Sequence, residues 1–298
     1  MSKFTKLKMK IIILIPIYND WQSATKLLEN INNEVSGIDH TFSIILVNDA
    51  STEQITGNLS NFSNLNSVEI LNLKQNIGHT RCIATGLNHI IKNEEFDYVI
   101  PMDGDGEDRP EEIKLFIENF NYHPNKTIVG ERVKRSESIL FKLCYSFHKI
   151  LTYTFTGQSI KFGNYTCLTK STIEKMLSDK ATWSSFSGSL AKNCYDRAVI
   201  SSERGKRYFG PSKMSFVNLI KHSLAIIGVF KFNVLIRSIL FILVYLFLIY
   251  QKISFIMFIP LILIILFLVS TFIISKRENL YQLKNSLENI LNIDKIKL

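Results

Sequence analysis

The sequence MDGDGED, residues 102–108, directly follows the apolar run Tyr98–Ile100, where a buried strand is expected to end. Its acidic residues Asp103, Asp105 and Glu107 recur at every second position, so an extended backbone would direct all three side chains to one side. Carboxylate oxygens suit Mg²⁺ or Mn²⁺, and the phosphates of a substrate commonly complete the shell of such an ion. A solvated acidic turn at a strand end is the alternative. The neighbouring sequence favours the metal site.

Two apolar segments near the carboxyl end are long enough to cross a membrane. Residues 253–274 carry no charge over about 22 positions, and a helix of that length spans a hydrocarbon core of about 30 Å. Residues 238–250 are also uncharged, and they reach spanning length when extended back across Arg237, which could extend to the interface. Because the link Gln251-Lys252 is short, we expect a membrane hairpin. Two buried soluble helices are less favoured, since neither segment carries a polar stripe.

The distribution of charged residues predicts the orientation of this hairpin in the membrane and limits the classes of possible ligand. The positive-inside rule puts the N-terminal body and the C-terminal tail in the cytoplasm, as for a protein of the bacterial inner membrane. The net charge of +9 suits anionic headgroups and phosphorylated ligands, and no basic stripe with interleaved aromatics indicates nucleic acid. Four scattered cysteines predict neither a zinc site nor a disulfide framework. The cations on one side are Lys221, Lys231, Arg237, Lys276, Arg277 and Lys284, against Lys252 on the other.

The order of elements before the hairpin predicts an α/β fold. The apolar run Ile11–Ile15 follows several lysines and imitates a signal peptide, but Pro16 ends it early, so we interpret it as a buried strand of a parallel sheet. Three strands end in polar residues, at the edge where open α/β sheets bind ligands. Strands are expected at residues 11–16, 42–47, 68–72 and 97–102, and helices at about 21–35 and 79–91.

Short motifs follow one another in a fixed order along the body. They are Pro16–Asp20 (PIYND), Val47–Ser51 (VNDAS), Asn76–Gly78 (NIG) with Gly86, Met102–Asp105 (MDGD) and Arg109–Glu111 (RPE). Together they resemble the motifs of family 2 glycosyltransferases. Downstream, Val129–Arg135 (VGERVKR) and Arg207–Lys213 (RYFGPSK), followed by the hairpin, resemble the polyprenyl-phosphate glycosyltransferases, which include dolichol-phosphate mannose synthase and bacterial undecaprenyl-phosphate sugar transferases. The likeness covers about residues 10–275 and implies the GT-A nucleotide-sugar fold, a mostly parallel sheet with helices on both faces.

The resemblance implies a donor site for a nucleotide-diphosphate sugar. Asp103, Asp105 and Glu107 would bind the Mg²⁺ or Mn²⁺ ion that bridges the diphosphate, and Asp103 would also contact the nucleotide sugar. Ala50 replaces the usual glycine, and residues 161–165 replace a more acidic family segment, which leaves the donor sugar open. The base and ribose pocket would be lined by Pro16, Tyr18, Asp20 and Asp49, with Asp49 accepting hydrogen bonds from the nucleoside.

The acceptor implied by the resemblance is a polyprenyl phosphate. A lipid monophosphate is already anionic near neutral pH and can attack the anomeric carbon directly, so it needs positioning rather than a general base. Guanidinium forks and a lysine point charge suit that task. Taken singly, each cation would also suit a solvated or headgroup-facing surface. The expected phosphate-binding residues are Arg132, Arg135, Arg207, Ser212 and Lys213, and the four cations join Asp103 and Asp105 as the expected catalytic residues.

We therefore expect a membrane-anchored, metal-dependent, inverting transferase with four parts: a catalytic domain (1–215), a juxtamembrane helix at the membrane interface or packed on the body (216–232), two transmembrane helices (233–275) and a cytoplasmic amphipathic tail (276–298). The tail repeats apolar residues at helical spacing. These are Leu280, Leu283, Leu287 and Ile290.

Two other functions stay open. A transferase of the same fold acting on a polysaccharide or glycolipid hydroxyl would need a base, commonly in a Glu-Asp pair, and no such pair occurs between Pro124 and Phe216. A non-catalytic membrane binding or assembly protein would not need the acidic triad. His79 lies near a motif, and a structural hydrogen bond is its favoured role over contact with the diphosphate. The oligomeric state, a homo-oligomer included, is not specified.

Overall fold

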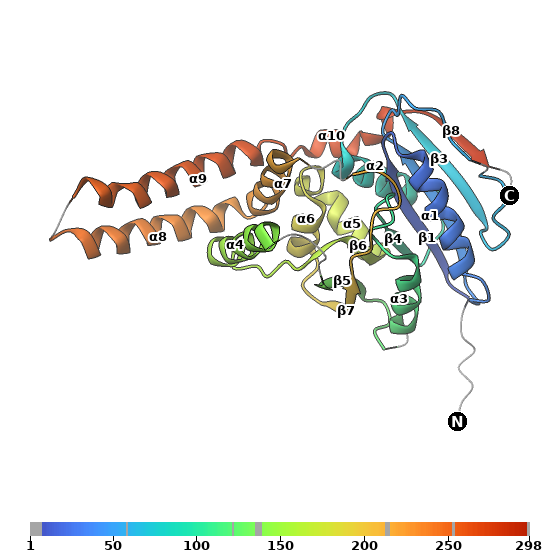
Figure 1. The fold of residues 1–298 in the computed structure, drawn as a ribbon, viewed down its shortest axis with the longest axis horizontal. Helices are drawn as coiled ribbons and strands as arrows, with labels where there is room; N and C mark the ends of the chain where they lie inside the picture. The colour runs from blue at the N-terminus through green and yellow to red at the C-terminus, as the bar shows by residue number, and fades with distance from the viewer. Residues whose placement is uncertain are drawn as a thin grey trace.

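A mixed sheet forms the centre of the molecule in the computed structural model, which describes residues 8–57, 59–120, 122–134, 139–211, 215–251 and 254–296 (Figure 1). Its strands are β1 (Lys10–Ile17), β2 (Thr41–Asn48), β3 (Ser67–Leu73), β4 (Tyr98–Pro101), β5 (Thr127–Lys134), β6 (Phe162–Thr169), β7 (Arg197–Glu203) and β8 (Ile290–Ile296). They are ordered β7-β5-β6-β4-β1-β2-β3-β8. The pairs β1–β2, β1–β4, β2–β3 and β5–β7 are parallel, whereas β6 and β8 pair antiparallel with their neighbours. The predicted α/β architecture is confirmed.

Helices cover both faces of the sheet, so the central strand β1 is buried on each side. The covering helices are α1 (Trp21–Glu34) and α3 (Ile113–Phe120) on one face, and α2 (His79–Asn93), α5 (Lys170–Ser178) and α6 (Phe186–Asn193) on the other. Because side chains alternate along a strand, Ile13 and Ile15 pack in the core with α1 and α3, while Ile12 and Leu14 pack with α2, α5 and α6. This explains why the run has no polar alternation.

Gly86, the glycine that follows the NIG motif within α2, allows this helix to lie close to the sheet. A Cβ atom added at Gly86 would meet the side chain of Leu14 at 2.4 Å and that of Val47 at 3.1 Å. Both neighbours are fully buried, so they have little room to yield. Gly86 therefore sets the distance between α2 and the strands β1 and β2.

We expect Gly86→Ala to lower the free energy of unfolding by about 1–3 kcal/mol, because the added methyl group overpacks the core. Thermal unfolding of the purified protein measures the loss. Gly228→Ala is the matched control, since a Cβ atom there meets nothing closer than 3.5 Å. Equal stability of the two variants would show that the contact with Leu14 does not limit the packing of α2.

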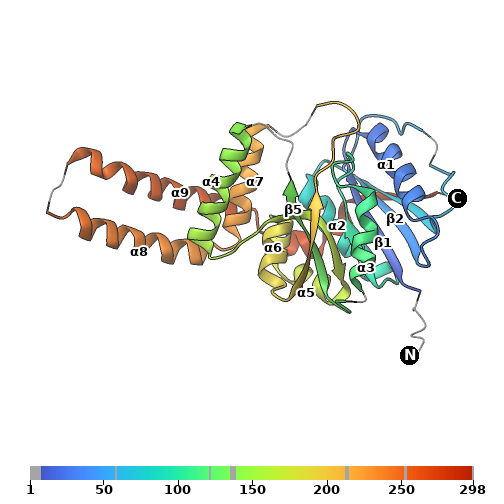
Figure 2. The same cartoon turned by 60° about the horizontal axis from the view of Figure 1, so that its bottom comes forward.

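Two long apolar helices extend away from the body (Figures 1 and 2). They are α8 (Lys231–Ile249) and α9 (Ile259–Ser275), the latter preceded by the 3₁₀ turn η3 (Phe255–Phe258). Both are long and apolar enough to cross a membrane, and only 11% of either apolar stretch is buried in the protein. A core helix of a soluble protein would be mostly buried, so this exposure fits the predicted hairpin.

A helix that the sequence analysis missed, α4 (Ile139–Thr156), lies beside α7 (Phe216–Gly228) at the base of the hairpin (Figure 2). Its last carbonyl groups have no partner within the helix, and α8 supplies donors for them. Arg237 donates to the carbonyl oxygen of Thr154 at 2.8 Å, and Asn233 donates to that of Thr156 at 3.2 Å. Arg237 thus caps α4, a role that the sequence analysis did not predict for it.

The tail differs from the predicted amphipathic helix. Only α10 (Leu280–Lys284) is α-helical, a 3₁₀ turn η4 (Ser286–Asn289) follows, and the chain then forms β8 along the edge strand β3. Leu283 is buried against Ala84 and Trp183, but Ile290 begins the strand. The prediction of a helical repeat through Ile290 was wrong because residues 290–296 complete the backbone hydrogen bonds of a sheet edge.

Candidate active site

The carboxyl ends of three neighbouring strands bring acidic residues to one edge of the sheet. β4, β1 and β2 are adjacent and parallel, and Asp103, Asp20 and Asp49 follow their respective ends. This is the ligand-binding edge of an open α/β sheet. The expectation that the polar strand ends meet is confirmed.

Asp49 organises the loop that begins α2. It is almost fully buried, and its two carboxylate oxygens accept hydrogen bonds from the backbone amides of Ile77 at 2.7 Å and Gly78 at 3.0 Å. Gly78 has a φ of +91°, a conformation that glycine adopts without strain. Asp49 therefore holds the NIG motif against β2, and its contact with a nucleoside stays a prediction.

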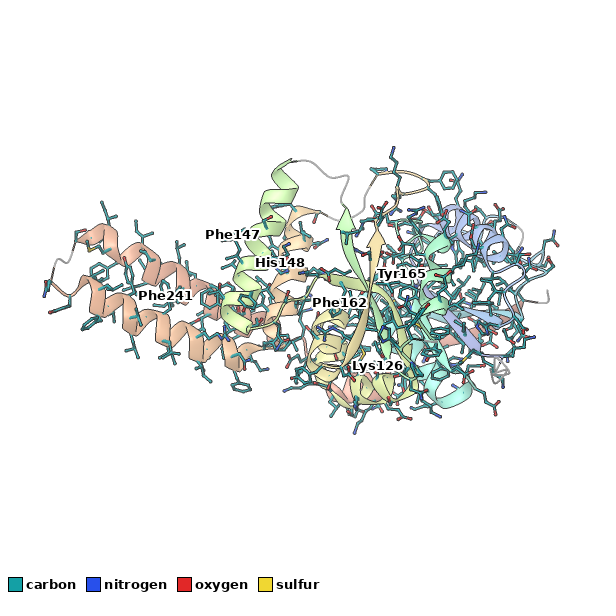
Figure 3. The ribbon with its side chains drawn as sticks, turned by 90° about the horizontal axis from the view of Figure 1, so that it is seen from below. Lys126, Phe147, His148, Phe162, Tyr165 and Phe241 are labelled. Carbon is teal, nitrogen blue, oxygen red and sulfur yellow. The ribbon has the colours of Figure 1, made fainter. Side chains whose placement is uncertain are left out.

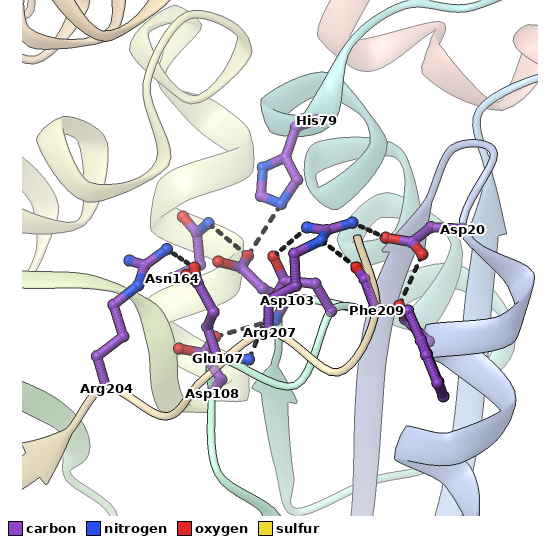
Figure 4. Close-up of polar contacts among 11 residues, drawn as sticks. Asp20, His79, Asp103, Glu107, Asp108, Asn164, Arg204, Arg207 and Phe209 are labelled. Atoms are coloured by element: carbon purple, nitrogen blue, oxygen red, sulfur yellow. Dashed lines mark hydrogen bonds and ion pairs between the residues drawn. The ribbon is translucent and has the colours of Figure 1, made fainter. Parts of the chain in front are cut away.

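Asp103 is held by two side chains that contact the same oxygen (Figure 4). His79 Nε2 lies 3.0 Å from Asp103 Oδ1, and Asn164 Nδ2 lies 3.2 Å from the same atom. The backbone amide of Asp103 donates to Asp108 Oδ2 at 2.9 Å. These contacts both engage Oδ1, and none of the hydrogen bonds described here uses Oδ2. The hydrogen bond expected of His79 is made with a predicted metal ligand.

Two of these carboxyl groups are shifted in opposite directions. Burial and the charge of Asp103 raise the pKa of Asp108 to about 7, and the charge of Arg132 opposes that rise only in part. Burial would also raise the pKa of Asp103, but the hydrogen bond and charge of His79, together with the charge of Arg132, hold it well below its usual range. Asp103 is the charged member of the pair, as a metal ligand has to be.

The acidic stretch is a turn, not the extended segment that the sequence suggested. Gly104 and Asp105 are turn residues, and Gly106 has a φ of +87°. The turn directs Glu107 to an ion pair with Arg204, a residue that the sequence analysis missed. Alternation of side chains applies only to a strand, so the physical argument for one shared side was wrong, although the metal-ligand assignment stays a prediction.

Residues 204–210, here called the strap, lie across this turn (Figure 4). Arg207 bridges two carboxylates, forming an ion pair with Asp20 and another with Asp105 at 2.8 Å. Tyr208 donates its backbone amide to the carbonyl oxygen of Asp105 at 2.9 Å, and its ring leaves no room for a Cβ atom at Gly106. The strap therefore depends on the absence of a side chain at Gly106 as well as on charge.

The donor set fits a divalent cation. Hard carboxylate oxygens are the ligands that Mg²⁺ and Mn²⁺ prefer. The guanidinium group of Arg207 already occupies a cation position between Asp20 and Asp105, and Arg204 neutralises Glu107. A metal ion at Asp105 or Glu107 would take over the charge balance that these arginines now supply.

The other predicted residues lie around the same edge or outside the described part of the chain. Arg132 on β5 reaches to 3.6 Å from Asp108, above Gly163, whose missing side chain makes room for the guanidinium. Pro16 is buried within β1, and Tyr18 is half exposed beside it. Three predicted phosphate ligands lie outside the described residues: Arg135, Ser212 and Lys213.

A second acidic group lies away from this edge. One ligand atom each of Glu69, His89 and Glu94 come within 4.8 Å of one another, a spacing that would suit a metal ion. Lys295 of β8 already forms an ion pair with Glu69 at 3.0 Å, and the side-chain amide nitrogen of Asn93 lies 3.1 Å from His89 Nδ1. These partners give the group a structural role in fastening β8 to β3 and α2.

Comparison with known proteins identifies the family. The profile described as "Glycosyl transferase family 2" matches residues 12–176, more than half of the chain. The chain belongs to glycosyl transferase family 2, and the resemblance drawn from the motifs is confirmed. An undecaprenyl-phosphate 4-deoxy-4-formamido-L-arabinose transferase of Proteus mirabilis (strain HI4320) is 30% identical over 229 residues, which are 74% of this chain and 67% of that protein. Relatives of this name match over 64–67% of their length, so the chain spans about two thirds of them.

Solved structures show the same fold at low identity. S. aureus TarS 1–349, solved in complex with UDP-GlcNAc, has a TM-score of 0.52 at 17% identity and covers 77% of this chain and 70% of its own. The mannosyltransferase PcManGT of Pyrobaculum calidifontis, solved with GDP-Man and Mn²⁺, has a TM-score of 0.50 at 11% identity, with 91% and 88% covered. At this identity the likeness supports the GT-A fold alone.

The proton on Asp108 generates a prediction for stability. A free aspartate titrates at about pH 3.9, so Asp108, with a pKa of about 7, binds its proton more tightly in the folded protein. This tighter proton binding raises the free energy of unfolding. Its contribution is complete below about pH 4 and is lost as the pH rises through about 7. We expect the unfolding temperature of the EDTA-treated protein to fall less between about pH 5 and pH 8 in Asp108→Asn than in the unmodified protein.

Thermal unfolding at several pH values measures this difference. The amide oxygen that Asp108→Asn introduces can still accept the hydrogen bond from the backbone of Asp103, so the variant should fold. Asp196→Asn, at an exposed carboxylate on the surface, is the control and should keep the pH dependence of the unmodified protein. Parallel curves for Asp108→Asn and the unmodified protein would refute a proton on Asp108 in the folded state.

Proposed function

We propose that this protein transfers a sugar from a nucleotide-diphosphate sugar to a polyprenyl phosphate, for which its relatives' names indicate undecaprenyl phosphate. One observation carries the proposal: carboxylates and guanidinium groups lie next to one another at a single edge of the sheet. Asp103 and Asp105 suit a metal-bound diphosphate, and Arg132 and Arg207 beside them suit a second phosphate. The sugar lies between a leaving phosphate and an attacking one in such a reaction.

The proposed reaction requires the acceptor phosphate to be positioned next to the sugar. It does not require a general base to remove a proton from the acceptor. An oxygen of the acceptor phosphate forms a bond to the anomeric carbon while the bond between that carbon and the diphosphate oxygen breaks. The nucleoside diphosphate leaves with the electron pair, and attack from the opposite side inverts the anomeric configuration. Mg²⁺ or Mn²⁺ held by Asp103 and Asp105 would stabilise the charge on the departing diphosphate. Arg132 and Arg207 would bring the anionic acceptor close to the sugar by neutralising it.

Arg207 links the donor and acceptor parts of this proposal. Its ion pairs with Asp20 and Asp105 occupy the place that a cation and a nucleotide would need. Binding of the metal and the donor would therefore release Arg207 from both carboxylates. The freed guanidinium would then be available to the acceptor phosphate, so the donor would bind first.

The surroundings of the site fit a membrane-bound acceptor. The exposed apolar side chains of α4 and α7 include Phe147 and Ile150 on α4 and Phe216 on α7, which suit the headgroup region next to a membrane hairpin. Figure 3 shows Phe147 on the outer side of α4 and Phe241 on α8, both away from the body. We infer that α8 and α9 span a bacterial inner membrane, with the site on the cytoplasmic side.

The acceptor hypothesis predicts separate effects on lipid and donor. Arg132→Gln or Arg207→Gln should raise the KM for undecaprenyl phosphate about tenfold or more, because each loses a charge-assisted phosphate contact. Donor affinity in the presence of Mn²⁺ should stay within about threefold, and Arg207→Gln should leave it unchanged or tighter, since a competitor for Asp105 is removed. Asp105→Ala should instead weaken metal-dependent donor binding. Steady-state rates and calorimetry with a panel of nucleotide sugars provide both measurements.

Lys126→Gln is the charge-matched control for the two arginine variants. Lys126 pairs with Asp196 on the surface and should affect neither substrate. Undecaprenol, which lacks the phosphate, should not serve as an acceptor. Equal losses for lipid and donor, or efficient transfer to a hydroxyl acceptor, would favour the transferase that acts on a polysaccharide or glycolipid.

The topology generates a further prediction. Two proposed spans and the concentration of basic residues on one side of the hairpin support a cytoplasmic location for both chain ends. Lys231 shares this side with Glu278, its ion-pair partner at 2.9 Å, whereas Lys252, expected on the other side, lies outside the described residues. Phosphatase and fluorescent-protein fusions after residue 298 should report a cytoplasmic carboxyl end. Phosphatase activity in the periplasm would mean an odd number of spans.

A further inference from the structure

Arg81, in the first turn of α2, has a guanidinium group without a counterion. Its Nε atom is buried and has no hydrogen-bond acceptor, and the group lies over the ring of Trp183 at 5.3 Å from the centroid. Within the described residues, no carboxylate lies within 4.0 Å of it. Burying a charged guanidinium group without a counterion is costly, and an anion bound at its outer nitrogens would offset that cost.

The guanidinium opens onto a cavity of about 170 Å³ between α2 and the tail. Side-chain amides line it, among them Gln75 from the loop before α2 and Gln282 and Asn285 from the tail. α10 lies beside α2 (Figure 1). The lining residues include one acidic group, Glu288, which is at the rim. Amide NH₂ groups and a guanidinium fork are the donors that recognise phosphate oxygens.

The walls of the cavity are fixed by hydrogen bonds. Trp183 Nε1 (in the 3₁₀ turn η2, Lys180–Trp183) donates to Gln282 Oε1 at 2.8 Å. Asn88 of α2 donates to the carbonyl oxygen of Leu283 at 3.2 Å and to Ser286 Oγ at 2.9 Å. A site built from such restrained parts binds a ligand without first having to order them.

A second cation, Arg277, acts on the guanidinium group of Arg81 through its charge. Arg277, just after the end of α9, also lacks an ion-pair partner among the described residues. Burial lowers the pKa of Arg81, and the charge of Arg277 lowers it further. Two guanidinium groups that repel each other are stabilised by an anion between or beside them. Because Arg277 follows the second span of the proposed hairpin, the cavity lies near the membrane surface if that hairpin crosses the bilayer.

We propose that this cavity binds a phosphate group, supplied by the headgroup of an anionic membrane lipid or by a soluble phosphate ion. Arg81 would bind two oxygens through its fork, and the amides of Gln75 and Asn285 would donate to the others. The cavity adjoins the donor edge at Ile77, which lines the cavity and whose backbone amide donates to Asp49. Its other lining residues come from the loop before α2, from α2, from η2 and from the tail, and do not include the acidic residues of that edge. It does not depend on the identity of the sugar donor or acceptor.

Trp183 provides the measurement, because the chain has two tryptophans and the other, Trp21, is buried in the core. The full chain carrying Trp21→Phe, which leaves Trp183 as the sole reporter, is titrated with inorganic phosphate in detergent. The same protein is then placed in nanodiscs of phosphatidylcholine with increasing phosphatidylglycerol. We expect a saturable change in Trp183 emission with at least one of these probes.

Three variants test whether the change in Trp183 emission arises from binding in the cavity. Arg81→Met, which keeps an unbranched apolar side chain but removes the guanidinium group, should weaken binding about tenfold or more. Glu288→Gln should strengthen it a few-fold, since it removes a like charge from the rim without altering buried groups. Lys276→Gln removes one positive charge, as Arg81→Met does, but Lys276 does not line the cavity, so binding should stay within about twofold.

The outcomes separate the two sources and the competing explanations. A response to inorganic phosphate supports a soluble anion, and a response only to phosphatidylglycerol supports a lipid headgroup. No saturable response to either, or the same response in Arg81→Met, would overturn the proposal. An equal loss of nucleoside diphosphate binding in Arg81→Met would overturn it too, by making the cavity part of the donor site. If Arg81→Met fails to fold, an unchanged affinity in Glu288→Gln is sufficient to reject the site.

Discussion

Carboxylates gathered at one edge of an apolar sheet repel one another, and the structure balances them with cations from distant parts of the chain. Arg207 bridges Asp20 and Asp105, and Arg204 pairs with Glu107. The side chains of these pairs are mostly buried, so water screens their charges less than at a free surface. The position of the strap is a consequence of this balance. Ligands that change the charge at the edge, whether metal or phosphate, will therefore also change what holds the strap in place.

Local sequence patterns predicted the strands and helices around β1 to within a few residues. Buried parallel strands appear as continuous apolar runs, and glycine and polar residues end them. The same reasoning placed Asp49 and Asp103 at the strand ends, where they lie. It failed where the backbone left regular structure: alternation did not apply to the turn at Gly106, and helical spacing in the tail did not reveal β8. Whether a segment becomes an edge strand depends on the strand with which it pairs. The spacing of apolar residues within the segment gives no information about that partner.

The remaining site residues were invisible for a different reason. Asn164 contacts Asp103 across 61 positions of sequence, and Arg204 contacts Glu107 across 97. No periodicity links such pairs, since the packing of β6 and the course of the strap decide them. His79 was noticed because it follows the NIG motif, and its expected hydrogen bond was present. His79 makes this hydrogen bond with Asp103, a predicted metal ligand. The same contact therefore has a structural role and lies within the proposed functional site. A sequence pattern alone could not distinguish the two.

The first turns of α2 connect features that the chain order keeps apart. The amides before the helix hold Asp49, His79 holds Asp103, and Arg81 opens toward the tail. Gly86 lets the helix pack closely on β1, and Asn88 fastens it to the tail that returns from α9. A closely packed helix transmits displacement instead of absorbing it. The proposed membrane hairpin is thus connected to the acidic edge by a continuous set of contacts, which runs from the tail through Asn88 of α2 to His79 and Asp103.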